Sequence, residues 1–281
     1  MPRRAAEILA AGRAGLSAAG RSVSAMPSAQ GDANAAWALM DDAVRRQAPL
    51  LCAPQPAAVG LCSTCRGPAA AAGGRCYQCG QHEQCAPGSL ADVVVPVAYA
   101  RKGGAHARHL WLYKSGRPGA AAAGTVLRAM TLTFLRDHGP CVWQRTGLAG
   151  PTHLAVVPSG RGRPGDHPLR ALLGRCLRLP WAELAARPGS SGPVRELDPA
   201  RFTARRLAGA AVALLDDTWT TGSAAQSAVL SLRQAGARAV AVIVLGRHLP
   251  AEDDGRPASA FCPEVMPFRP ASCAVHHAGC D

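Results

Sequence analysis

Two adjacent carboxylates followed by a hydroxyl-rich turn are the residues of this chain with the most defined chemistry. Asp216 and Asp217 end a run of small and apolar residues that starts at Val212, and a Thr/Gly/Ser turn follows them. Such acids suit sugar hydroxyls or a hydrated metal ion. The unpaired N–H groups of a helix N-terminus after the turn would favour a phosphate. This order predicts a sugar-phosphate pocket, and the alternative is an Asp-Asp turn that only caps a helix.

Four cysteines in two C-x2-C pairs form a second group with a recognisable chemistry. Ten residues separate the pair Cys62 and Cys65 from the pair Cys76 and Cys79. Each pair can point two thiolates at one metal, so the two pairs together predict a tetrahedral structural zinc site. The segment between them is too poor in apolar residues to form its own core, so metal would stabilise its fold. Disulfides and redox-active thiols are the alternatives, and the substitute ligands are Cys52, His82 and Cys85.

A strand, a turn and a helix must position the two acids. The apolar residues after the turn recur with the spacing of one helix face: Ala225, Ala228, Val229 and Leu232. Ser223 is expected to cap this helix, and Gly236 is expected to end it. The unbroken apolar run 239–245 then predicts a strand buried on both faces of a parallel sheet. A strand–helix–strand unit of this kind binds its ligand beyond the carboxyl ends of the strands.

Further elements are expected on the amino-terminal side of this unit. Residues 1–50 predict a disordered or partly helical extension, with one short helix over residues 36–47. A longer helix is expected to end at Gly139-Pro140, because its apolar face consists of Val126, Leu127, Met130 and Phe134. Residues 154–157 predict a short buried strand, and a helix that contains Leu169, Leu172, Leu173 and Cys176 is expected after it.

Composition and charge place the chain among soluble proteins. Its 281 residues suffice for one α/β domain and a smaller unit, and no apolar stretch is long enough to cross a bilayer. The net charge is +13, and residues 101–175 carry many arginines against only Asp137 and Asp166. A basic face attracts polyanions, which include both a diphosphate sugar and single-stranded DNA. No hydrophobic secretion segment is evident, so we expect a cytoplasmic protein.

The acidic segment Leu215–Ser223 resembles the phosphoribosyl-diphosphate (PRPP) motif of type I phosphoribosyltransferases. In that family the two acids bind the ribose 2′- and 3′-hydroxyls, and the turn holds the 5′-phosphate. The resemblance implies a PRPP site that consists of Asp216, Asp217, Thr218, Thr220, Thr221, Gly222 and Ser223. It also implies Mg²⁺ as a cofactor that binds together with PRPP. Trp219 occupies a position that varies in the family.

A cysteine-rich module before such a domain is the layout of the ComF-like family, which is related to a competence protein of DNA uptake. Residues 99–104 and 110–116 are similar to that family's aromatic entry strand and Lys-x-Gly segment. Lys114 in this segment is one of only two lysines in the chain, and a solvated surface lysine is the alternative. The resemblance implies an α/β fold: a type I phosphoribosyltransferase-like parallel sheet with flanking helices, preceded by a small zinc-binding module.

A pyrophosphate-binding loop is implied after the strand at 154–157. Type I enzymes bind pyrophosphate at this point through backbone amides and a basic residue, and the candidates are Ser159, Gly160, Arg161 and Gly162. An Arg-Gly surface loop is the alternative. The chain departs from the family's Arg-Gly-Phe-Asn ending, because Asp166 and His167 follow instead, and we expect them to cap the next helix. Because of this departure, the sequence supports PRPP binding more strongly than it supports catalytic turnover.

Together these features predict an organisation and a function. The extension covers 1–50, the zinc-binding module 51–90, the phosphoribosyltransferase-like domain 91–250 and a tail 251–281. The expected function is PRPP binding and transfer of the phosphoribosyl group to an unidentified nitrogen acceptor, with release of pyrophosphate. The alternative is a non-enzymatic PRPP-fold regulator or a DNA-uptake accessory factor, and self-association stays open. A second metal site in the tail is also open, at Cys262, Cys273, His276, His277 and Cys280.

Overall fold

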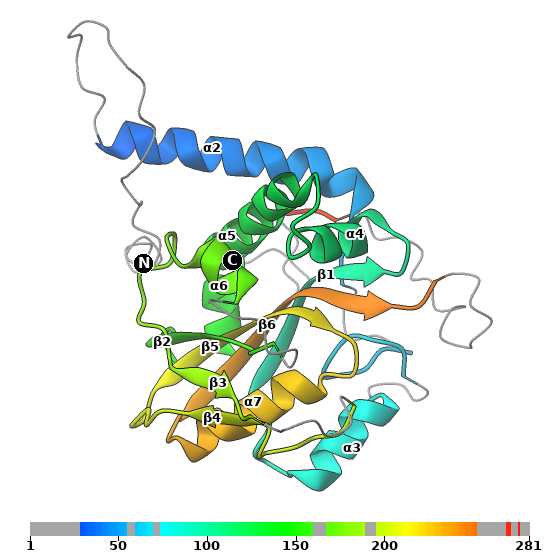
Figure 1. The fold of residues 1–281 in the computed structure, drawn as a ribbon, viewed down its shortest axis with the longest axis vertical. Helices are drawn as coiled ribbons and strands as arrows, with labels where there is room; N and C mark the ends of the chain where they lie inside the picture. Colours follow the sequence, from blue (N-terminus) through cyan, green and yellow to red (C-terminus); the bar gives the residue numbers. More distant parts are fainter. Residues whose placement is uncertain are drawn as a thin grey trace, which may run out of the picture.

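A central sheet with helices on both sides forms the body of the protein (Figure 1). The structure is a computed structural model that describes residues 29–54, 60–69, 74–159, 167–188, 195–251, 268–270 and 275. In chain order its elements are α2 (Ala29–Gln47), the 3₁₀ helix η1 (Ala48–Leu50), α3 (Tyr77–Cys85), β1 (Val93–Arg101), α4 (Ala105–Leu112), α5 (Ala120–Gln144), β2 (His153–Val156), α6 (Pro168–Leu173), β3 (Leu184–Ala186), β4 (Phe202–Ala204), β5 (Ala211–Trp219), α7 (Ser223–Gln234) and β6 (Ala239–Leu249).

The central sheet has four parallel strands in the order β1-β6-β5-β2. β5 and β6 are the inner strands, and α7 connects them. β1 and β2 are the two outer strands. β3 and β4 form a separate antiparallel pair. The expected parallel sheet with flanking helices is therefore confirmed. The pairing of β5 with β2 ends at Leu215, directly before the two acids, whereas Asp216 still pairs with Val244 of β6.

Side chains of the sheet alternate between two apolar cores. Residues of β6 that pack in the core with α5 are odd-numbered, and those that pack with α7 are even-numbered (Ala241, Ile243 and Leu245 against Val240, Val242 and Val244). β5 follows the same alternation over residues 211–215, because successive side chains of a strand point to opposite faces. Both faces are therefore covered, which explains why these strands are continuously apolar.

Helix α5 differs from the sequence-based expectation at its C-terminal end. The predicted end at Gly139-Pro140 is wrong, because the helix includes Pro140 and continues to Gln144. A proline inside a helix costs about 3 kcal/mol. Val142 and Trp143 lie beyond it and are buried in the core, and full burial of such side chains contributes about 1.5–3 kcal/mol each. Packing of the last helical turn against the core thus outweighs the tendency of Pro140 to end the helix.

The strand and helix that hold the acidic motif have slightly different boundaries from those expected. β5 does not end at Asp217 but continues to Trp219, and Gly222, not Ser223, is the N-cap of α7. Gly236 follows the helix with a positive φ, as expected for a residue that ends it. The helix predicted over residues 36–47 is part of the longer α2. Among the described residues, no helix has the length and apolar character that crossing a membrane requires.

Candidate functional site

The side chain of Asp217 lies in a small polar cluster at the carboxyl end of β5. Lys114 Nζ lies 2.7 Å from Asp217 Oδ2, and the Tyr113 hydroxyl donates to the same oxygen at 2.6 Å. Because both donors meet Oδ2, neither of them occupies Oδ1. Asp217 is only 8% exposed, whereas Asp216 is half-buried. Lys114 is therefore not a solvated surface lysine but the partner of a buried carboxylate.

Close packing between α4 and β6 brings Tyr113 and Lys114 to Asp217. A Cβ atom at Gly246 of β6 would lie 2.3 Å from Leu110 and 2.9 Å from Ala100, so glycine is needed for this approach. His106 Nε2 lies 2.9 Å from the Leu245 carbonyl oxygen, which fixes the start of α4 on the sheet. The C-cap of α4, Tyr113, then lies beside the carboxyl end of β5.

The two adjacent acids differ in their ionisation. Burial, together with the charge of Asp217, raises the pKa of Asp216 to about 7. Burial alone would raise the pKa of Asp217 as well, but the Lys114 ammonium and the hydrogen bonds from Lys114 and Tyr113 lower it below its usual value. Asp217 is thus an ionised acceptor at neutral pH, while Asp216 titrates there and donates when protonated. The pair can accept from one hydroxyl and donate to its neighbour.

A buried indole and a glycine shape the turn after β5. Gly222 has a φ of 82°, and a Cβ added to it would lie 2.0 Å from the ring of Trp219. Arg247 Nη1 donates to the carbonyl oxygens of Trp219 and Thr220 at 3.1 and 3.2 Å. Thr220 is exposed in this turn. The backbone of the turn is thus fixed by its own indole and by a side chain of β6.

The Ser223 side chain points into the protein and not out of the turn. It is fully buried, and its hydroxyl contacts the Arg195 carbonyl oxygen and Thr221 Oγ1. Ser227 and Ser231 continue the same helix face. Ser227 Oγ accepts from the Asp198 N–H at 2.9 Å, and Ser231 Oγ donates to the Phe202 carbonyl at 3.2 Å. These serines hold the segment 195–202 against α7 by hydrogen bonds, so the Ser223 hydroxyl has a structural role.

The four predicted metal ligands lie together. The Sγ atoms of Cys62, Cys65, Cys76 and Cys79 are all within 4.8 Å of one another. Cys65 Sγ and Cys76 Sγ are 3.8 Å apart, and a tetrahedral zinc with Zn–S bonds of about 2.3 Å places its sulfurs about 3.8 Å apart. Hydrogen bonds with Cys62, Cys65 and Cys76, together with burial, raise the pKa of Cys79, so a bound cation is needed to hold it as a thiolate. The cluster could therefore hold a metal ion such as zinc.

Two short segments position the cysteine ligands. The first folds back on itself: the Cys62 N–H donates to the Gly67 carbonyl at 2.7 Å, and the Cys65 N–H donates to Cys62 Sγ at 3.5 Å. The second begins at Cys76, the N-cap of α3, and carries Cys79 in the first turn of that helix. The substitute ligands lie outside this cluster of four sulfurs: Cys52 pairs with Tyr99, Cys85 is exposed and His82 contacts Ser223.

Several other predicted residues lie outside the described part of the chain. Of the pyrophosphate-loop candidates, Ser159 is described and half-buried, whereas Gly160, Arg161 and Gly162 are not. His167 caps α6 as expected, since its Nδ1 accepts from the Leu169 N–H at 3.2 Å. Asp166 and the tail residues Cys262, Cys273, His276, His277 and Cys280 also lie outside the described residues, as does most of the extension, residues 1–28.

Sequence reasoning did not identify Tyr113 as a site residue. The available signal was its position directly before Lys114, but only the approach of α4 to β5 shows that both side chains reach one carboxylate oxygen. A comparison with protein-family models gives no match for this chain, and a comparison with curated proteins gives no significant match either.

Proposed function

We propose that this protein binds PRPP and transfers its phosphoribosyl group to a nitrogen acceptor with release of pyrophosphate. The placement of Asp216 and Asp217 carries this proposal: they lie at the carboxyl end of an inner parallel strand, directly before a turn and the N-terminus of α7. A helix N-terminus suits the 5′-phosphate. An acid pair that can both donate and accept suits the adjacent ribose hydroxyls.

Lys114 and Tyr113 have a supporting role in this proposal. By holding Asp217 Oδ2, they orient the carboxylate toward a ribose hydroxyl. Mg²⁺, when bound, would neutralise charge on the diphosphate. Because Asp217 already has a cationic partner, we expect this ion to be held mainly by the diphosphate oxygens. The chain's own contribution is then to bind the sugar and to fix its orientation.

The cysteine cluster is proposed to hold a structural zinc ion. Four thiolates close a tetrahedral site and leave no position for a substrate, which is the pattern of structural sites. Three of the four cysteines are buried, and these three belong to the same core as Trp219 and the apolar face of α7. Zinc would therefore stabilise the surface against which the phosphate turn packs.

Binding is tested by calorimetry of the zinc-loaded protein with PRPP and Mg²⁺. We expect saturable binding that the double variant Asp216→Asn, Asp217→Asn abolishes without loss of fold. The pair Asp41 and Asp42 on α2 is the matched control, because it offers the same double substitution on a helix that packs against α5; since Asp41 pairs with Arg136, the same check of the fold applies to this control. Absence of binding by folded wild type at millimolar PRPP would sink the proposal. Salt-sensitive binding of single-stranded DNA, unaffected by the double variant, would favour the DNA-handling alternative instead.

Turnover is tested separately, by release of pyrophosphate from PRPP in the presence of a panel of purine, pyrimidine and amine acceptors. Release that depends on one acceptor class and on Asp217 supports a transferase. Tight PRPP binding without release for any acceptor would instead identify a protein that uses PRPP as a regulatory ligand.

A further inference from the structure

Arg247 is a buried arginine at the carboxyl end of β6. In the strand register it lies between Tyr99 of β1 and Trp219 of β5, and it is only 8% exposed. Its Nη1 donates to the carbonyl oxygens of Trp219 and Thr220, where β5 passes into the turn 220–222, and also to that of His248. One guanidinium therefore fixes two successive carbonyl groups at the start of this turn.

The same guanidinium lies against the cysteine-bearing segment. A Cβ atom added to Gly67 would be 2.1 Å from Arg247 Nη2 and 2.9 Å from its Nε, so a side chain at this position would displace the guanidinium. The Gly67 carbonyl oxygen accepts from the Cys62 N–H at 2.7 Å. Arg247 thus contacts the short loop that carries the first cysteine pair.

The charge of Arg247 is matched by the cysteine cluster when zinc is bound. Its hydrogen-bond acceptors among the described residues are neutral carbonyl groups, and its Nε is buried without a partner there. Four thiolates around one Zn²⁺ carry a net double negative charge. Hydrogen bonds to the other three cysteines have the largest effects on the pKa of Cys65, and the charge of Arg247 adds to its lowering, to about 6. The cluster is therefore within electrostatic reach of Arg247.

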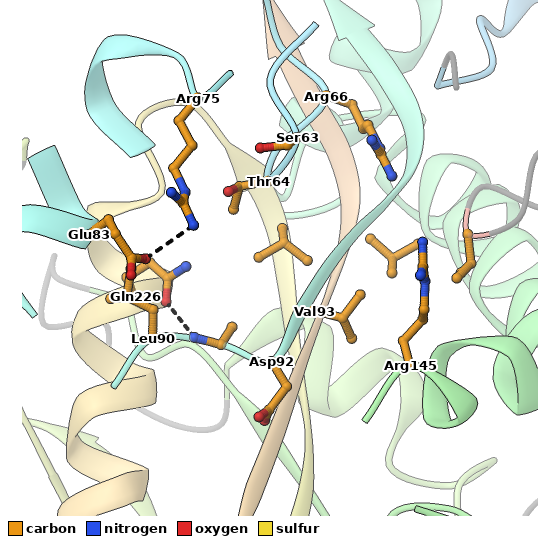
Figure 2. Close-up of a pocket in the computed structure, with 14 residues that line it drawn as sticks. Ser63, Thr64, Arg66, Arg75, Glu83, Leu90, Asp92, Val93, Arg145 and Gln226 are labelled. Carbon is orange, nitrogen blue, oxygen red and sulfur yellow. Dashed lines mark hydrogen bonds and ion pairs between the residues drawn. The ribbon is translucent and has the colours of Figure 1, made fainter. Parts of the chain in front are cut away.

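Arg66 lies in the same electrostatic field but faces a different part of the molecule. Burial lowers its pKa, whereas Cys62 and Cys65 act in the opposite direction. Its guanidinium points toward Arg145 in a pocket of about 340 Å³ beside β1 (Figure 2). The turn residues 220–222 are not among those that line this pocket. Arg66 therefore shares the charge environment of Arg247 without its contact to the turn.

We infer that Arg247 is a positioning residue through which zinc occupancy of the cysteine cluster orders the turn after β5. With zinc bound, the negative cluster holds the guanidinium, and the guanidinium fixes the turn carbonyls. Without zinc the two cysteine pairs are no longer tied together, and water solvates a guanidinium better than neutral carbonyl groups alone do. The inference rests on the proposed zinc site, but not on the proposed transfer reaction.

The test measures hydrogen–deuterium exchange of residues 216–226 in the full chain, with zinc and after chelation. We expect exchange of this segment in the wild type to become at least tenfold faster on chelation. In Arg247→Gln it should be fast in both states. Residues 127–134 of α5 are the internal control and should exchange at the same rate throughout. Equal exchange of 216–226 with and without zinc, or an equal acceleration in α5, would overturn the inference.

Two further variants separate the charge of Arg247 from its hydrogen bonds. Coupling between two sites is reciprocal, so Arg247→Gln should also weaken zinc binding about tenfold in competition with a chelator. Arg247→Lys keeps the charge but loses the planar set of donors, so it should bind zinc nearly normally while the turn exchanges fast. Arg66→Gln is the matched control: it should weaken zinc binding but keep the zinc-dependent difference in exchange. Loss of that difference in Arg66→Gln would contradict a specific role of Arg247.

PRPP binding distinguishes this inference from the proposed function. In the wild type, affinity for PRPP should fall at least tenfold after chelation, and in Arg247→Gln it should not depend on zinc. If the folded, zinc-loaded protein does not bind PRPP, the proposed function fails, while the exchange experiment still decides the role of Arg247. If the wild type does not bind zinc, both the proposed zinc site and this inference are wrong.

Discussion

His82 Nε2 lies 3.3 Å from Ser223 Oγ, and this contact joins the cysteine-bearing helix α3 to the first residue of α7. Both side chains are buried. A second link runs through Arg247, which binds the turn carbonyls and lies so close to Gly67 that an added Cβ would be 2.1 Å from its Nη2. The cysteine cluster and the turn after β5 are therefore neighbours in one packed unit, and the geometry of each depends on the other.

The contact between His82 and Ser223 predicts that His82→Ala weakens sugar-phosphate binding without removing the metal. Loss of one buried hydrogen bond is worth about 0.5–1.5 kcal/mol, so calorimetry should show affinity for PRPP reduced roughly threefold to tenfold. Gln81→Ala on the exposed face of the same helix is the control and should bind normally. If both variants bind PRPP like the wild type, the link between the two sites is only structural.

Metal removal should destabilise the fold around the cluster. We expect about one zinc per chain by elemental analysis, and we expect Cys76→Ser or chelation to lower the melting temperature by roughly 5–10 °C, because the zinc–thiolate bonds that join the two cysteine-bearing segments are lost. Cys85→Ser is the control: Cys85 lies on the same helix but is exposed and outside the cluster. An unchanged melting temperature after complete metal removal would exclude a structural role.

The two lysines of the chain provide a matched pair for the Asp217 cluster. Lys114→Gln removes the ion pair and should raise the pKa of Asp217, since burial then acts without the compensating ammonium. The carboxyl ¹³C shift as a function of pH measures this change, and affinity for PRPP should fall about tenfold or more. Lys102→Gln alters an exposed lysine and should leave both quantities unchanged. If the pKa of Asp217 were the same in the Lys114→Gln variant as in the wild type, the role assigned to Lys114 would be contradicted.

Two glycines with nearly the same φ allow the cost of backbone strain to be measured separately from the cost of a steric clash. Gly209 has a φ of 78° and open space around it, whereas Gly222 has a φ of 82° and faces the Trp219 ring. Gly209→Ala should lower the free energy of unfolding by about 1–2 kcal/mol. Gly222→Ala should lower it by a further 1–3 kcal/mol, because the indole must move. If urea titrations gave equal losses of unfolding free energy for the two variants, the Trp219 indole would move aside without measurable cost.

The raised pKa of Asp216 gives stability a defined pH dependence. Between the ordinary value of 3.8 and the folded value of about 7, the folded chain retains a proton that the unfolded chain has released. Stability contributed by this group is therefore complete below that window and is lost as pH rises through it. Relative to Asp216→Asn, the wild type should lose unfolding free energy on the order of 4 kcal/mol across the window. If the unfolding free energies of the wild type and of Asp216→Asn, measured by denaturant titration, changed with pH in parallel, the raised pKa of Asp216 would be contradicted.

Local sequence patterns predicted the elements of the sheet well and the ends of some helices poorly. The apolar run of β6 and the spacing of apolar residues in α7 result from burial on both sheet faces, and that pattern is legible without coordinates. Pro140 misled the prediction for α5, because its effect is local whereas the burial of Val142 and Trp143 is decided by the rest of the fold. Contacts with residues distant in the sequence therefore determined where α5 ends, in spite of the proline.

The sequence by itself determined the ligand-forming groups: two cysteine pairs with metal spacing, and two acids before a turn and a helix. Spacing is enough here, because residues two or three apart are held together by the backbone. Only the tertiary structure decided that Tyr113 and Lys114 share one oxygen of Asp217, that the Ser223 hydroxyl is directed inward and that the cysteine module supports the turn. Those contacts join residues about 28 to 141 positions apart, and close packing of helices on the sheet brings them together.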